Sequence, residues 1–146
     1  MKENISSVYF RELFRVLVRK LGILERENAV CCNITLSQCH AIVEVGRVPD
    51  ISLNDLASAL DLNKSTVSRI VDQLAEKNIL IRKTDREDRR YIALHLSEEG
   101  NILFNTIETY MNAYFQKVLR AIPADKRVQV IESLQILQRA LDKNHC

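Results

Sequence analysis

Residues 53–78, LNDLASALDLNKSTVSRIVDQLAEKN, decide the fold because they predict two short helices joined by a tight turn. Ser52 precedes the first helix and Asn63 precedes the second, and such side chains accept hydrogen bonds from the N–H groups of a first helical turn. Apolar residues then recur at helical spacing in both segments, at Leu53, Leu56, Ala57 and Leu60 and at Val67, Ile70, Val71 and Leu74. The stretch therefore predicts a helix-turn-helix.

The outer face of the second helix is suited to DNA. Ser65, Ser68 and Arg69 point away from the apolar face at 100° per residue. Small hydroxyl side chains let a helix enter a major groove, and an arginine can bond guanine at two atoms. Asp72 and Glu76 farther along would repel phosphate, so we expect the N-terminal end of the helix to dock. The alternative is an ordinary surface helix, and the next segment favours the DNA-binding interpretation.

A predicted β-hairpin follows this helix. The segments ILIRK (79–83) and YIALHL (91–96) are rich in β-forming residues and flank the charged stretch TDREDRR (84–90). A hairpin behind a helix-turn-helix is a wing, whose tip lies beside the DNA backbone or in the minor groove. We expect Arg86 and Arg89 to contact phosphates or the narrow minor groove. Asp85 and Asp88 would pair with neighbouring arginines such as Arg90; the alternative is a merely solvated tip.

Composition narrows the class of protein. The 146 residues are 47% hydrophobic and 27% charged, with only three Gly and two Pro, which favours a mostly helical globular chain. The formal net charge is +2, so attraction to nucleic acid must come from local placement of charge. No apolar run approaches the roughly 18 residues of a membrane span, and the N-terminus lacks the apolar core of a signal peptide. We expect a cytoplasmic protein without a membrane partner.

Amphipathic helices flank the winged segment. We expect them at residues 8–24, from Thr35 with Gln38 as its capping-box partner, from Ser97 to about residue 120, and from Pro123 to residue 141. The wide apolar faces of the first and last two helices exceed what a small winged domain needs as cover. They predict self-association, and a two-fold dimer would place two recognition helices in successive major grooves.

The cysteines allow three interpretations. Cys31, Cys32, Cys39 and Cys146 follow neither a zinc-ribbon nor a disulfide spacing, so the first interpretation is small buried or incidental thiols. The second is a thiol sensor. Cys31 and Cys32 would lie in the connection between the first helix and the helix that starts at Thr35, and oxidation or alkylation of Cys31, Cys32 or Cys39 would strain that connection. The third is a soft-metal or metalloid site formed by Cys31, Cys32, Cys39 and His40. No other cofactor is required.

Three motifs resemble those of the multiple-antibiotic-resistance regulator (MarR) family of winged helix-turn-helix repressors. They are LNKSTVSRIVDQLAEKN (62–78), DREDRR (85–90) and LSEEG (96–100), and ITLSQCHAIVEV (34–45) and the closing helices extend the likeness to nearly the whole chain. Ser97 replaces the family's usual threonine and Asn78 its usual glycine. Serine also caps helices, and asparagine also tolerates the left-handed conformation.

The resemblance implies a fold, a set of contacts and a mode of control. The fold is mostly α with a small β-wing: a winged helix-turn-helix lobe at residues 35–97, with dimerisation helices at 1–34 and 98–146 of a single MarR-like domain. The implied DNA contacts are Lys64, Ser65, Thr66, Ser68 and Arg69 from the recognition helix and Arg86 and Arg89 from the wing, which Asp88 and Arg90 would brace. An effector would bind between the dimerisation helices and the lobe and lower operator affinity.

We therefore expect a homodimeric repressor of an inverted-repeat operator in double-stranded DNA, relieved by a small-molecule, thiol-reactive or metal signal. Oxidant-sensing members of the family carry a reactive cysteine early in the first helix, where this chain has none. Zinc-sensing members use histidines of the long fifth helix, and residues 98–120 of this chain contain no histidine. The alternatives are a helical protein-interaction domain without DNA binding and a thiol-dependent enzyme. An enzyme is not expected, because His40, His95 and His145 lack a partner carboxylate or serine pattern and His95 fits a surface position.

Overall fold

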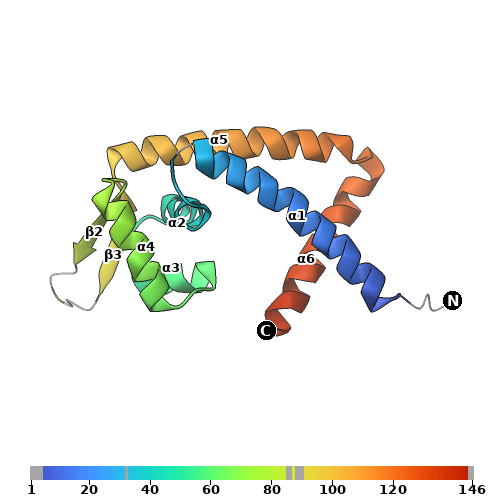
Figure 1. Cartoon of the computed structure of the whole chain (residues 1–146), viewed down its shortest axis with the longest axis horizontal. Helices are drawn as coiled ribbons and strands as arrows, with labels where there is room; N and C mark the ends of the chain where they lie inside the picture. The colour runs from blue at the N-terminus through green and yellow to red at the C-terminus, as the bar shows by residue number, and fades with distance from the viewer. Residues whose placement is uncertain (1–4, 32, 85–86, 88–90, 145–146) are drawn as a thin grey trace. The chain divides into compact units, whose positions relative to one another are not determined.

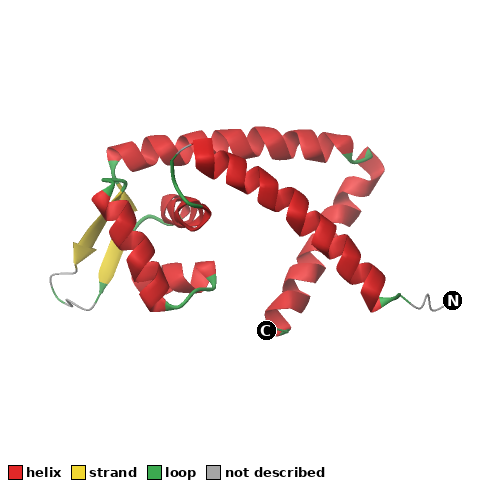
Figure 2. Cartoon of the chain, viewed as in Figure 1, coloured by secondary structure: helices red, strands yellow, loops and turns green. Residues whose placement is uncertain are grey.

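The computed structural model describes residues 5–31, 33–84, 87 and 91–144, with residues 23–31 described by backbone alone. Six α-helices and three short strands occur in these ranges (Figures 1 and 2). The helices are α1 Ser7–Cys31, α2 Leu36–Arg47, α3 Leu53–Leu60, α4 Lys64–Glu76, α5 Glu98–Ala121 and α6 Arg127–Lys143, and the strands are β1 Ile51–Ser52, β2 Leu80–Thr84 and β3 Ile92–Leu96. The expected fold class, mostly helical with a small β-wing, is confirmed.

The chain divides into two compact units. Unit 1 spans Met1–Ile107 and unit 2 spans Glu108–Cys146, so the long helix α5 contributes its first part to unit 1 and its second part to unit 2. Unit 1 contains α1 to α4 and the sheet, and unit 2 contains α6. The expected assignment of residues 1–34 and 98–146 to dimerisation stays a prediction.

The helix starts in unit 1 follow the predicted capping signals. Thr35 and Gln38 form a capping box: the Thr35 Oγ1 atom accepts from the Gln38 amide at 3.2 Å, and Gln38 Oε1 accepts from the Thr35 amide at 3.1 Å. Ser52 caps α3 by accepting from the Asp55 amide at 3.0 Å. Ser97 caps α5 in the same way, accepting from the Gly100 amide at 3.0 Å. These short-range bonds set where each helix begins.

One apolar core holds the lobe together. The most completely buried side chains of unit 1 come from α2, α3, α4, β3 and α5: Ile42, Val45, Leu56, Val67, Val71, Leu74, Leu94 and Ile107. Burying one such side chain contributes about 1.5–3 kcal/mol relative to leaving it exposed. This core fixes the inner face of α4, so the opposite face of that helix is left toward solvent.

The sheet has three antiparallel strands in the order β1-β3-β2. The hairpin pairs Leu80 with Leu96 at its base and Thr84 with Ile92 at its far end, as the two β-forming segments predicted. The edge strand β1, in which Ile51 pairs with Leu94, was not predicted. Two residues are too few to show the alternation by which a strand is recognised.

Two expected boundaries were wrong. The first helix continues to Cys31 instead of ending near residue 24, so Cys31 is the last helical residue and does not lie in the connection. Pro123 does not begin the final helix but precedes a 3-10 turn, Ala124–Lys126, after which α6 starts. Arg127 secures this corner of unit 2, because its Nε donates to the carbonyls of Leu119 at 3.0 Å and Ile122 at 3.1 Å.

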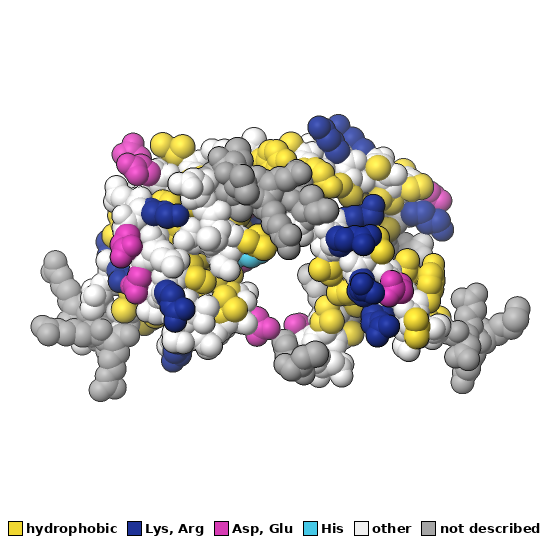
Figure 3. Space-filling view, in the orientation of Figure 1, with side chains coloured by type: hydrophobic (Ala, Val, Ile, Leu, Met, Phe, Trp, Pro, Cys, Tyr) yellow, Lys and Arg dark blue, Asp and Glu magenta, His cyan; other side chains and the backbone are white. Residues whose placement is uncertain are grey.

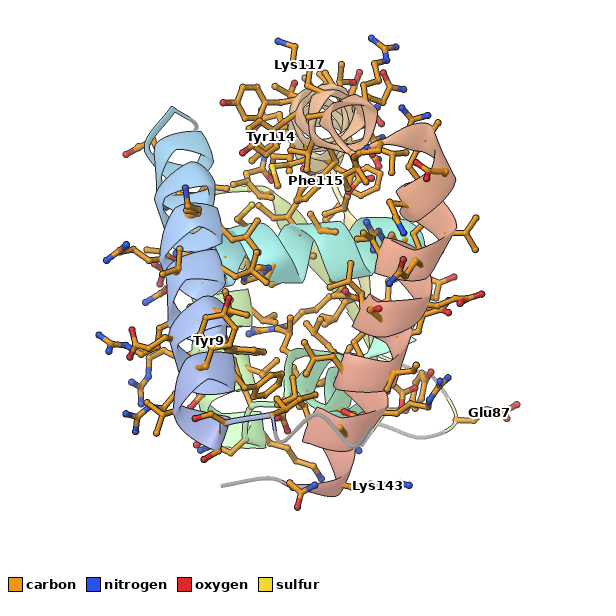
Figure 4. All side chains as sticks on the ribbon, turned by 90° about the vertical axis from the view of Figure 1, so that its right-hand side faces the viewer. Tyr9, Glu87, Tyr114, Phe115, Lys117 and Lys143 are labelled. Carbon is orange, nitrogen blue, oxygen red and sulfur yellow. The ribbon has the colours of Figure 1, made fainter. Side chains whose placement is uncertain are left out.

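The helices outside the lobe leave large apolar side chains exposed. On α1 these are Val8, Tyr9, Phe10, Leu13, Val16, Leu17 and Val18. Figure 3 shows hydrophobic and basic side chains interspersed on the visible surface. In unit 2 they include Tyr110, Tyr114, Phe115, Val118, Val128, Ile131, Leu134 and Leu141. Tyr114 and Phe115 meet edge to face with their ring centroids 5.5 Å apart (Figure 4). Throughout the described ranges, no helix is long and apolar enough to cross a membrane.

Candidate nucleic-acid interface

The start of α4 is tightly fixed. Asp61, at φ 54, ends α3 in the left-handed conformation, and Asn63 then caps α4. The Asn63 Oδ1 atom accepts from the Thr66 amide at 2.9 Å and from the Ser65 hydroxyl at 2.8 Å. The direction in which α4 leaves the turn is therefore set by local bonds as well as by the core.

The five residues of α4 predicted to contact DNA all lie in its first two turns. Lys64, Ser65 and Arg69 are exposed, while Thr66 and Ser68 are half-buried. The inner face is buried at Val67, Ile70, Val71 and Leu74, with at most 7% of any of these residues exposed. The division of α4 into a core face and an outer face is as the sequence predicted, and the two cationic side chains lie in its first two turns.

A polar groove lies where α3 turns into α4. Its lining includes Asn54, Ser58, Asp61, Asn63 and Lys64. Most of these side chains can donate hydrogen bonds, and Lys64 adds a positive charge at the N-terminal end of α4, where the helix dipole also favours an anion. Lys64 can contact a phosphate from this groove, whereas the Asp61 carboxylate in the same lining would repel one.

An ion pair joins α4 to the wing. Arg82 on β2 contacts Asp72 in the third turn of α4, and both side chains are partly exposed. The sequence analysis treated Asp72 only as a charge that repels phosphate. The pairing with Arg82 reduces that repulsion, and no short-range pattern could have revealed it because the partners lie on different elements.

The wing is described up to its last strand pair. Figure 1 shows β2 and β3 projecting beyond α4, and the exposed Glu87 lies in the tip (Figure 4). The predicted contacts Arg86 and Arg89, and the bracing residues Asp88 and Arg90, lie outside the described residues. Their roles stay predictions.

The candidate sensor residues are only partly described. Cys39 is a buried thiol, 8% exposed, near the start of α2, whereas His40 beside it is exposed. Cys31 is described by backbone alone, and Cys32 and Cys146 lie outside the described residues. Within the described ranges, no cluster of three His, Cys, Asp or Glu side chains could hold a metal ion. The thiol and metal interpretations both stay hypotheses.

His95 does not occupy the simple surface position that we expected. Its side chain is 23% exposed, and it lies on β3, the middle strand of the sheet. The Nδ1 atom is buried without a hydrogen-bond partner, 3.9 Å from Asp50 Oδ1. The pairing of β3 with strands on both sides explains the burial, which a hairpin alone would not have predicted.

Comparison with known proteins identifies the lobe. Residues 34–92 match the model of the MarR family. They form a MarR-family domain. The family that the sequence motifs indicated is thus confirmed, and the matched range covers α2 to the start of β3, which includes the whole of the helix-turn-helix.

Relatives of the chain are regulators by name. The HTH-type transcriptional regulator BilQ of Clostridium symbiosum is 23% identical over 137 residues, covering 94% of this chain and 90% of BilQ. FabT of Streptococcus pneumoniae, solved in complex with DNA, superposes with a TM-score of 0.87 at 19% identity, covering 94% of this chain and 99% of FabT. MepR of S. aureus, solved as a DNA complex, gives a TM-score of 0.79 at 21% identity over 90% of this chain and 97% of MepR. Of the function classes considered, the comparisons support the DNA-binding transcriptional regulator and not the interaction domain without DNA binding.

Proposed function

We propose that the protein is a homodimeric transcriptional repressor that binds an inverted-repeat operator through α4 and the wing. The observation that carries this proposal is the outer face of α4. Lys64, Ser65 and Arg69 are exposed together at the N-terminal end of a helix whose other face is completely buried. An exposed, capped helix end with two cations and small hydroxyl groups fits a major groove.

The charges on α4 set its orientation toward DNA. Its cations, Lys64 and Arg69, lie in the first two turns, and the acidic Asp72 and Glu76 lie beyond them. Phosphates are attracted to the N-terminal end by side chains and helix dipole together. We therefore assign Ser65, Ser68 and Arg69 to the major groove, Lys64 and Thr66 to the backbone, and Arg86 and Arg89 to the flanking phosphates or minor groove.

The exposed apolar faces of α1 and of unit 2 support the homodimer. A monomeric soluble protein rarely exposes extended apolar faces of this kind. A two-fold dimer would bury them and place two copies of α4 about 34 Å apart, one turn of DNA. The operator should then be palindromic. A protein that acts on DNA in this way has no need of catalysis, and we expect it in the cytoplasm.

The proposal is tested by selecting binding sites from a random duplex library and measuring variants on the selected site. Arg69→Ala should cost about 1–3 kcal/mol and relax one base position, whereas Arg86→Ala should weaken all sequences evenly and reduce the salt slope by about 1. Arg139→Ala, which removes an exposed arginine from α6, is the matched control and should change neither. Equal losses on every sequence for Arg69→Ala would contradict direct base contact.

A further inference from the structure

Gln38 is a buried polar residue that joins three parts of unit 1. Only 3% of it is exposed. Besides capping α2, its Oε1 atom accepts from Lys77 Nζ at 3.2 Å, and its Nε2 atom donates to Gln73 Oε1 at 3.1 Å. The amide is thus bonded both to its own helix start and to the far end of α4. Capping of α2 requires only the bond from the Thr35 amide, so it does not explain the bonds to Lys77 and Gln73.

The two partners on α4 form one attachment. Gln73 and Lys77 lie four residues apart, so they share a face of the helix region. Lys77 Nζ also donates to the carbonyl of Asn33 at 3.2 Å. Asn33 is in the left-handed conformation, at φ 54, in the segment ahead of α2. The end of α4 opposite to its DNA-contacting turns is therefore bonded to both α2 and the segment before it.

The hydrogen bonds of Gln38 oppose rotation of α4 about its own axis, and the apolar core opposes that rotation less strongly. Apolar burial is not directional, and the inner face of α4 could keep most of its contacts through a small rotation about the helix axis. Side chains lie about 5–6 Å from that axis, so a rotation of about 10° moves them by about 1 Å. Such a displacement is enough to break hydrogen bonds to base edges, whose donor–acceptor distances fall within about 0.5 Å of one another.

We propose that Gln38 is a positioning residue for DNA recognition, which sets the rotation of α4 through Gln73 and Lys77. This inference rests on the proposed function. The proposal predicts different effects on two kinds of contact. Contacts to the DNA backbone tolerate a small rotation of α4, whereas contacts to base edges do not. Loss of the attachment therefore lowers specificity more than it lowers general affinity for duplex DNA.

Gln73→Met is the first variant, because Gln73 is exposed and its loss leaves the capping box and the Lys77 bond in place. Gln135→Met, the same change at an exposed position of α6, is the matched control. We expect Gln73→Met to lower affinity for the selected operator about tenfold, as the loss of one base contact would. Affinity for random duplex and the salt slope should stay within about twofold of wild type, because phosphate contacts determine both.

Variants of Gln38 itself distinguish positioning from packing. Gln38→Glu keeps the acceptor for the Thr35 amide and for Lys77, and the Gln73 amide can turn over to donate to it. Gln38→Met has a similar size but keeps none of these bonds. We expect Gln38→Glu to retain the ratio of operator to random-duplex affinity within about threefold and Gln38→Met to lose about tenfold or more.

The outcomes separate the two proposals. If the wild-type protein selects no duplex, the proposed function fails and the inference fails with it. If the wild type selects a site and Gln73→Met keeps the wild-type ratio, only the inference is overturned. An equal loss on operator and random duplex would also overturn it, because that result indicates general damage to the fold and not a rotated helix.

Discussion

Replacing Gly100 with alanine should destabilise the joint between α4 and α5. A Cβ atom at this position would overlap the carbonyl oxygen of Ile79 and lie 3.2 Å from the Leu96 Cβ. The same carbonyl accepts from the Ser97 amide at 2.9 Å and from the Ser97 hydroxyl at 3.2 Å, so it cannot move without disturbing both bonds. Overpacking costs about 1–3 kcal/mol and each perturbed bond up to about 1 kcal/mol, against a gain of about 1 kcal/mol in helix propensity.

The net loss from Gly100→Ala should be about 2 kcal/mol, which lowers Tm by about 4–8 °C for a chain of this size. Urea unfolding followed by circular dichroism measures the free energy directly. Gly22→Ala is the matched control, because a Cβ there meets nothing within 4 Å, and it should stabilise α1 by about 0.5–1 kcal/mol. At Gly46 the obstacle is the ring of Phe104, a side chain that can turn, so Gly46→Ala should cost less than Gly100→Ala. Wild-type stability for Gly100→Ala would refute the reasoning.

Three further substitutions test other contacts. Leu74→Ala removes a fully buried side chain from α4 and should lower the free energy of unfolding by about 2–5 kcal/mol in a guanidinium titration. Asn63→Ala removes the acceptor for the Thr66 amide and should cost about 1 kcal/mol, with faster hydrogen exchange confined to the first turn of α4. Arg82→Ala should change stability by less than about 1 kcal/mol, yet weaken binding to all duplexes because Asp72 loses its partner; unchanged affinity at low salt would contradict this.

Short-range signals predicted much of the fold. Thr35, Ser52 and Asn63 act on amides three residues away, so their neighbours in the sequence were enough to place three helix starts. Asn78, at φ 60, adopts the left-handed conformation that was expected where the family usually has glycine. The first helix was predicted too short, because residues 25–31 are mostly polar or small and no longer repeat the apolar spacing.

Capping and periodicity signals could not predict the contacts between elements. The bonds of Gln38 to Gln73 and of Arg82 to Asp72 join residues that are 35 and 10 positions apart, and no periodicity relates them. The exposed outer face of α4 could be predicted because it lies opposite the buried apolar stripe of the same helix. The family resemblance supplied the function, since periodicity alone had reached only a DNA-binding dimer.

The length of the hairpin separates its charged tip from the folded core. The fully buried Leu94 of β3 pairs with Arg82, and Thr84 lies two residues farther along β2, about 7 Å at about 3.3 Å per residue. Electrostatic screening at physiological ionic strength acts over about 8 Å, which is close to that length. Charges carried beyond Thr84 therefore contribute little to the folding energy of the core. We therefore expect changes of charge in the wing sequence to alter its proposed contacts with DNA without a matching change in the stability of the lobe.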